Sequence, residues 1–190
     1  MDDQVKEIYG AVVAAIGTIL SAVASYPTES TRIIDLYKDF DIVGNTLQAV
    51  GNALQADGQK EPSLEKLGNE IQSIGNSTVL AGLVWNIEDD IEEKLVITGN
   101  WLQALGGAVA LGDEFKDPTA AGQIYNINGN LLQSIGNSLQ AIGGSINLKE
   151  KQLSKGEVSA SSGDSIIFAG SWIQAVGSVL SVIGQVKEES

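Results

Sequence analysis

The sequence contains no cysteine and no histidine. Without cysteine, the chain has no disulfide framework, no thiolate metal ligand and no cysteine nucleophile. Without histidine, it lacks the commonest general base, the commonest metal ligand and the side chain that changes charge near physiological pH. These two absences narrow the catalytic and metal-binding chemistry that we can expect of this protein.

Positive charge is also scarce. Lys and Arg together number 11 against 24 Asp and Glu, the formal net charge is −13, and Arg32 is the single arginine. This balance argues against binding a nucleic-acid backbone or an anionic membrane surface through charge, so we expect no nucleic-acid partner. The charges are dense at 113–117, 149–157 and 187–189, whereas 118–148 contains none.

Motifs of known chemistry are missing as well. The sequence has no phosphate-binding loop, dinucleotide fingerprint or nucleophile elbow. The acidic run 88–93 could suggest a di-metal carboxylate site, but bundle sites of that kind use Glu-x-x-His pairs. We interpret this run as a solvated helix start, and we expect no enzyme activity, no cofactor and no metal site.

What the sequence does contain is a seven-residue repeat, Gly-Asn-x-Leu-Gln-(Ala/Ser)-(Ile/Val), which is clearest at 122–144. A period of seven keeps the glycines on one line of a helix, whereas in a strand it would place successive glycines on opposite faces. The apolar positions also step by three and four, so the repeat predicts helices. Further copies lie at 44–58, 68–82, 99–106 and 163–184, and a fainter one at 10–17.

Glycine argues against this prediction, because each glycine inside a helix costs roughly 1 kcal/mol relative to alanine. The chain has 22 glycines. We expect close approach of helix backbones to offset the cost, since a missing side chain admits a neighbouring helix. The alternative, a turn every seven residues, is less favoured because hairpin turns prefer the order Asn-Gly.

We predict one all-α domain over 1–190, with about six helices in a compact bundle or layered array whose neighbours are antiparallel. A short solenoid of helical hairpins is the alternative. The apolar run 11–24 has lost the polar positions of the repeat, so we expect the first helix to lie in the centre. Helix breaks are predicted at Pro27, 59–62, 85–87, 111–117 and 149–156.

Side-chain amides form the most distinctive feature of the repeat, which we call the amide stripe. An exposed helix face normally carries Lys and Glu, so repeated neutral amides suggest pairing across a dry contact, within one chain or between copies. The alternative is a neutral solvated surface. The stripe comprises Asn45, Gln48, Asn52, Gln55, Asn69, Gln72, Asn76, Asn100, Gln103, Asn130, Gln133, Asn137, Gln140 and Gln174.

Two tryptophans, Trp101 and Trp172, occupy the same position of the heptad in different repeats. We expect them to pack at the edge of the core, and as a matched pair they could also anchor an interface.

A membrane location is not favoured by the sequence. The apolar run 11–24 is too short to span a bilayer, and the residues before it lack the positive charge of a signal peptide. The apolar stretches of the repeats are interrupted by Asn or Gln, which a bilayer tolerates poorly. We therefore expect no transmembrane segment and favour a cytoplasmic location, with a membrane partner as the less favoured alternative.

The repeats GNTLQAVGNALQ, GNEIQSIGN, GNWLQALGG and GNLLQSIGNSLQAIGG resemble a group of uncharacterised repetitive proteins from spore-forming bacilli. The resemblance covers most of 40–184 and implies a bacterial origin, but it transfers no catalytic or binding residue. From the repeats we predict a non-enzymatic structural or self-assembly protein. The alternatives are a membrane-active or pore-forming protein with amides lining a polar interior, and a carrier of an apolar small molecule.

Overall fold

The computed structural model describes residues 3–115, 120–154 and 162–188. In these residues it contains no strand and six helices: α1 (Asp3–Ala24), α2 (Thr31–Gly58), α3 (Leu64–Val84), α4 (Asp89–Glu114), α5 (Gln123–Leu153) and α6 (Ser162–Glu188). The prediction of an all-α fold with about six helices is confirmed. Residues 111–114 and 149–153, predicted to lie in helix breaks, extend α4 and α5 instead, and 116–119 and 155–161 lie outside the described residues.

Local sequence explains several helix starts. The Ser63 side chain accepts a hydrogen bond from the backbone N–H of Lys66 and caps α3. Acidic residues in the first turn of α4 lie at its positive end, where they are stabilising. Gly122 precedes α5 with a φ of 84°, a left-handed conformation that favours glycine.

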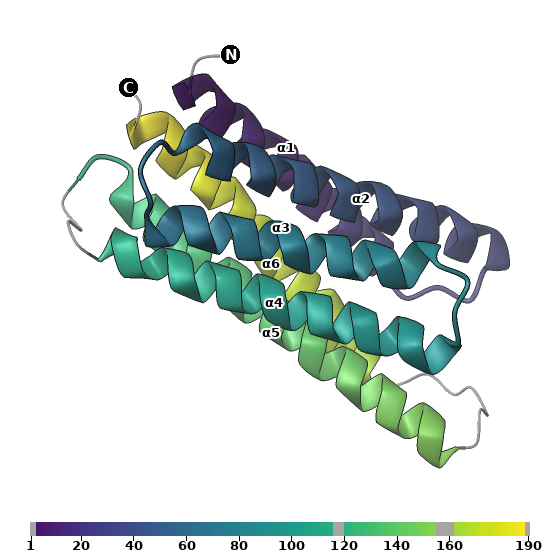
Figure 1. The fold of residues 1–190 in the computed structure, drawn as a ribbon. Helices are drawn as coiled ribbons and strands as arrows, with labels where there is room; N and C mark the ends of the chain where they lie inside the picture. The colour runs from purple at the N-terminus through teal and green to yellow at the C-terminus, as the bar shows by residue number, and fades with distance from the viewer. Residues whose placement is uncertain (1–2, 116–119, 155–161, 189–190) are drawn as a thin grey trace.

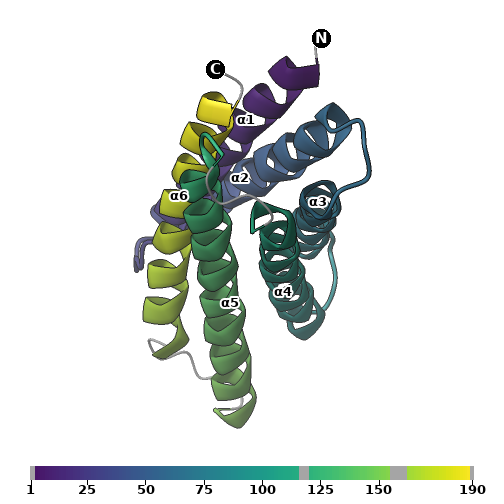
Figure 2. The ribbon, with the colours of Figure 1, turned by 90° about the vertical axis from the view of Figure 1, so that its left-hand side faces the viewer.

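The six helices form three antiparallel hairpins, α1/α2, α3/α4 and α5/α6, which close into a ring. Each helix contacts the helices next to it in the chain, and α1 also contacts α6. Figure 2 shows the helices following one another around this ring, and in Figure 1 the start of α1 and the end of α6 lie at the same end of the bundle. An open solenoid would leave α1 and α6 apart, so ring closure rules out that alternative.

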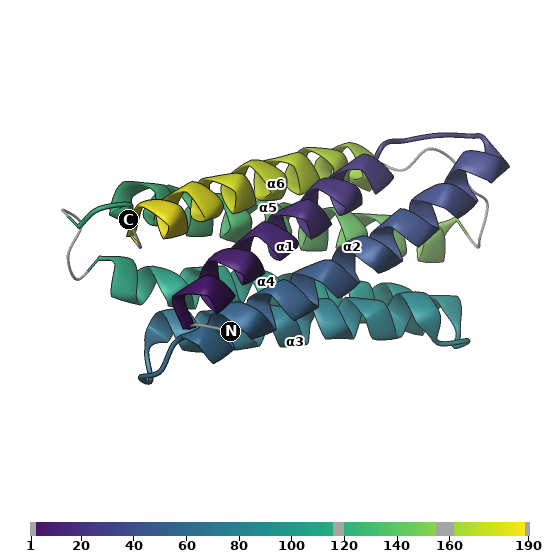
Figure 3. The ribbon, with the colours of Figure 1, turned by 90° about the horizontal axis from the view of Figure 1, so that it is seen from above.

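Within each hairpin the glycines of the two helices face each other. A Cβ atom added to Gly17 would lie 2.5 Å from the carbonyl oxygen of Gly44, and one added to Gly136 would lie 2.6 Å from that of Gly170. Figure 3 shows α1 and α2 side by side along this contact. The paired backbones therefore approach to a distance at which no larger side chain fits without movement.

The expectation that the first helix is central is wrong. α1 contacts only α2 and α6, and it occupies one place in the ring like the other helices. Its inner face carries small residues, among them Ala14, Thr18 and Ser21, and these leave room for longer amides from other helices. Its large apolar side chains, such as Ile16 and Ile19, are exposed.

Polar and apolar side chains are reversed relative to an ordinary water-soluble bundle. Among the described residues, the buried apolar side chains are alanines and Val79, whereas most of the buried polar side chains are Asn and Gln. Large Ile, Leu, Val and Trp side chains are exposed on every helix. In a soluble protein the larger apolar side chains are normally inside, so this arrangement requires an explanation.

Candidate functional site in the polar interior

The amide stripe faces the interior of the ring. Twelve of its fourteen residues are buried, and Gln55 and Gln140 are half-buried. Asn137 is completely inaccessible, with 0% exposure. The structure thus brings the stripe residues of five helices together inside one chain, and the stripe is not a solvated surface.

Four glutamines meet near the middle of the interior, and we call Gln48, Gln103, Gln140 and Gln174 the glutamine cluster. The Gln174 side-chain N–H donates to Oε1 of Gln48 at 2.8 Å and to Oε1 of Gln103 at 3.3 Å. Gln140 donates to Oε1 of Gln174 at 2.8 Å. Because Gln48 also donates to the Ser21 hydroxyl at 3.3 Å, the network joins five of the six helices.

Cavities lie on both sides of the glutamine cluster. The large cavity, of about 450 Å³, is lined by all four cluster residues and by Asp41, Asn45, Asn100 and Asp164. Its lining includes Tyr26 and Pro27, which are exposed, so it reaches the surface beside the α1–α2 turn. The small cavity, of about 20 Å³, is lined by residues from the other half of the helices, including Gln72, Gln133 and Ser178.

Carboxylates close the interior beyond the small cavity. Glu114 is buried, and its carboxylate accepts hydrogen bonds from Gln123 and, at 3.3 Å, from Asn130. Asn126 donates to Glu188, and Gln185 donates to Glu7, each at 3.0 Å. These contacts tie α1, α4, α5 and α6 together where the chain enters and leaves the ring.

Glu114, Gln123 and Gln185 were not predicted as interior residues because none of them is the Asn that the repeat has at this position. Continuing the period of seven from Gly99 places Glu114 at the position that Asn occupies elsewhere. The same step from Gly122 and Gly184 places Gln123 and Gln185 there. The heptad therefore contained the signal, although the residues at its ends depart from the consensus.

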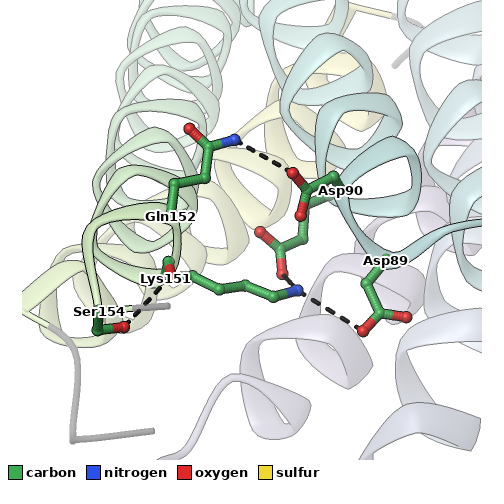
Figure 4. Close-up of polar contacts among 6 residues, drawn as sticks. Asp89, Asp90, Lys151, Gln152 and Ser154 are labelled. Carbon is green, nitrogen blue, oxygen red and sulfur yellow. Dashed lines mark hydrogen bonds and ion pairs between the residues drawn. The ribbon is translucent and has the colours of Figure 1, made fainter. Parts of the chain in front are cut away.

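At the opposite end, the acidic run 88–93 contacts the last turn of α5. Lys151 lies 2.7 Å from a Glu93 carboxylate oxygen and 3.7 Å from one of Asp89, and Gln152 donates to Asp90 at 3.2 Å (Figure 4). The Glu93 hydrogen bond, helped by the charges of Asp89 and Asp90, raises the pKa of Lys151. This run therefore fastens α4 to α5, and no cluster of potential metal ligands is found among the described residues.

The charged residues lie mainly toward the two ends of the bundle, and between them the helices form an uncharged belt. Apart from Glu70, near the start of α3, the middle of each helix carries no charge. At about 1.5 Å per residue the uncharged stretches are roughly 20 to 40 Å long, comparable with a hydrocarbon core of about 30 Å. The stretches are 8–24, 42–56, 71–84, 95–112, 123–148 and 165–186.

The expectation that no segment could cross a membrane is wrong. The three helices α1, α4 and α6 are long and apolar enough to do so, by length and composition. The prediction considered only the run 11–24, whereas α1 begins at Asp3, and it treated Asn and Gln as lipid-facing interruptions. In the structure these amides face the interior, so they leave the outer face apolar.

Trp101 and Trp172 lie on this outer face, with 47% and 41% of their surface exposed. Trp172 makes an edge contact with Phe168, which in turn contacts Tyr26. The two tryptophans therefore pack only partly against their own chain, and a large part of each ring is available to whatever surrounds the bundle.

One match to known protein families extends over nearly the whole chain. A family model, described as a family of unknown function (DUF6944), matches residues 5–182. The chain belongs to this family. Neither a curated protein nor a solved structure matches the chain. Membership in DUF6944 brings no activity with it, and the resemblance to repetitive proteins of spore-forming bacilli stays a prediction.

Proposed function

We propose that this protein is a non-enzymatic integral membrane protein whose ring of six helices stands in a lipid bilayer. The observation that supports this most strongly is the reversal of side chains, with amides inside and large apolar residues outside. Lipid would cover the exposed Ile, Leu, Val and Trp side chains. This removes the cost of exposing them to water, about 25 cal/mol per Å² of apolar surface.

The distribution of charge fits the same arrangement. The uncharged belt would lie in the hydrocarbon core, and the charged residues toward the two ends would lie among the headgroups and in water. Aromatic residues lie near both ends, including Tyr26 and Trp85 at one and Phe115 and Tyr125 at the other, and all four are half-buried or exposed. Tyr and Trp are enriched at membrane interfaces, where one side of the ring is apolar and the other polar.

Hydrogen bonds among the interior amides lower the cost of placing polar groups inside a bilayer. A buried amide is costly in hydrocarbon only when its hydrogen bonds are unmet. The glutamine cluster shows how the stripe meets this requirement, since Gln174 bonds Gln48, Gln103 and Gln140 across the interior. Helical backbones satisfy their own groups as well.

Self-assembly, the function we favoured from the sequence, is the second candidate, and one observation favours it. Copies could cover the same outer apolar face by packing against one another, with Trp101 and Trp172 as anchors. The amide stripe is inside the chain, so association would use the apolar positions instead. In that case the charged ends would give the assembly its soluble surface.

Membrane fractionation separates the two candidates. Cells producing the protein are lysed without detergent, and the membranes are washed with high salt and then with alkaline carbonate. The membrane proposal expects the protein to stay with the membranes through both washes and to float with purified liposomes. Recovery as a discrete soluble oligomer that does not float would overturn it in favour of self-assembly.

A further inference from the structure

The interior of the ring has the features of a pathway between the two ends of the bundle. The large cavity and the small cavity lie on opposite sides of the glutamine cluster; the small cavity is lined mainly by polar side chains, and the large cavity by amides and carboxylates together with apolar side chains such as Ile34 and Ile167. Their linings share no residue, so the cluster and its neighbours separate them. In this conformation the two cavities are therefore separate spaces within the part of the chain that the structure describes.

We propose that this interior conducts small uncharged hydrogen-bonding solutes, such as polyols and amides, and that the glutamine cluster is its closed gate. The inference rests on the proposed membrane location, because a pathway has a function only where two compartments are separated. It assigns the large cavity as the solute's entry site.

The chemistry of the lining selects the class of solute. Amide side chains both donate and accept hydrogen bonds and therefore suit hydroxyl and amide groups. The belt holds no charge that could compensate an ion entering low-dielectric surroundings. In the lining of the large cavity three acidic residues outnumber the one basic residue, Lys38, and this balance disfavours anions further.

The size of the large cavity supports entry of such a solute. Its volume of about 450 Å³ lies within the usual range of small-molecule sites, about 300 to 1,000 Å³. A carrier of an apolar molecule would instead need an apolar wall, whereas Asn45, Asn100 and the glutamine cluster line this cavity. The mixed lining, with several amides beside apolar side chains, suits a solute that carries hydrogen-bonding groups on a small apolar body better than a wholly apolar ligand.

The gate is built from contacts that can rearrange. Gln174 makes one short and one long bond, 2.8 Å to Gln48 and 3.3 Å to Gln103, through the same nitrogen. Close by in the belt, the buried atoms Asn76 Oδ1 and Asn137 Nδ2 have no protein partner. Buried groups of this kind are normally satisfied by water or by a polar ligand. A rotated glutamine would therefore find other partners within the same interior.

The absence of cysteine makes a direct test straightforward, because any cysteine introduced is the only thiol. Three single variants are reconstituted in liposomes and treated with hydroxyethyl methanethiosulfonate, a neutral water-soluble thiol reagent. Ser21→Cys lies in the large cavity, Ser178→Cys lines the small cavity, and Val176→Cys is on the outer face of α6.

We expect Ser21→Cys to react, and Ser178→Cys to react at least about tenfold more slowly. A tenfold difference in rate corresponds to a free energy of about 1.4 kcal/mol for opening the gate. Adding Gln174→Ala should remove that difference. The same variant should raise glycerol and urea permeability of the vesicles above that of wild type, measured by stopped-flow light scattering. Gln103→Ala is the second gate variant if Gln174→Ala does not fold, as judged by circular dichroism.

The control variant keeps the two proposals apart. In a second reaction, Val176→Cys in the same vesicles is treated with the charged reagent sulfonatoethyl methanethiosulfonate; fast reaction would show that the outer face meets water, and the membrane proposal would fail. Protection of Val176→Cys together with an unreactive Ser21→Cys would leave the membrane proposal standing and overturn the pathway. Permeability equal to that of empty vesicles for wild type and both gate variants would overturn it as well.

Discussion

The side-chain N–H of Gln174 on α6 donates a 2.8 Å hydrogen bond to Oε1 of Gln48 on α2, across the interior of the ring. The two helices are not neighbours, since α1 lies between them in the ring and their backbones are not in contact. Side-chain amides therefore bridge elements that backbone packing leaves apart. Because an amide has a fixed pattern of donors and acceptors, such bridges can specify the arrangement of helices where apolar contacts would not.

Replacing Gln174 by leucine tests this bridge. Leucine has a similar volume but no hydrogen-bonding group, so the Oε1 atoms of Gln48 and Gln103 would lose their donor inside the protein. We expect a loss of about 1–3 kcal/mol per unsatisfied group in the free energy of unfolding. Thermal unfolding in mild detergent measures the loss. Val176→Leu, on the exposed face of the same helix, is the control and should leave the midpoint nearly unchanged.

Close packing of glycine gives a second prediction. A Cβ atom at Gly136 would lie 2.6 Å from the backbone nitrogen of Gln174, so alanine there should push α6 away and destabilise the protein by about 1–3 kcal/mol. At Gly144 the added atom would meet only the side chain of Ile97, at 3.0 Å. Gly144→Ala should therefore cost much less. A higher unfolding midpoint for Gly136→Ala would contradict the packing described here.

The period of seven predicted the helices, because only a helix keeps glycine, amide and apolar positions on separate continuous lines. It could not tell which line faces inward. Gln48 and Val50, for example, belong to two stripes that are both continuous, and either could form the core. The choice depends on the surroundings, since water favours apolar residues inside and lipid favours the reverse.

The error over α1 has the same origin. The prediction of a central α1 rests on the residues at its polar positions, Ala11, Ala14, Thr18 and Ser21, and on the assumption that apolar residues gather inside. With the amides inside, small residues at these positions leave space for the side chains of other helices, as the contact between Ser21 and Gln48 shows. The sequence showed that α1 differs from the other helices, but it did not show where α1 lies in the ring.

Two half-buried carboxylates, Glu65 and Asp41, predict how stability depends on pH. Burial raises the pKa of Glu65 from 4.5 to about 7, and the nearby charges of Glu188, Glu7 and Asp113 act in the same direction. Burial likewise raises the pKa of Asp41 from 3.8 to about 6, against the hydrogen bonds from Ser21 and Asn45. The folded state thus binds these protons more tightly than the unfolded state does.

For Glu65, the raised pKa fixes the direction in which the free energy of unfolding changes with pH. The protonated acid favours the folded state below its folded pKa, so the free energy of unfolding should fall as pH rises from about 4.5 to about 7 and stay low above that. We expect a lower unfolding midpoint at pH 8 than at pH 5, and Glu65→Gln should reduce the difference by stabilising the protein at pH 8. Glu70→Gln, at an exposed position of α3, controls for the removal of one carboxylate. A midpoint that rises from pH 5 to pH 8 would contradict this.

Glutamate placed on the two faces of α5 tests the reversal of side chains itself. Asn137 is fully buried and Gln140 half-buried, so changing both to glutamate would put two like charges into the interior, and folding should suffer by several kcal/mol. Ile135→Glu, on the exposed face of the same helix, should leave the fold intact in detergent but prevent insertion into liposomes, since a charge in hydrocarbon costs about 2.5–3.5 kcal/mol or more. Circular dichroism reports the fold, and flotation reports insertion. If the interior pair is tolerated while Ile135→Glu unfolds the protein in detergent, the amides are on the outside and the membrane proposal has no support.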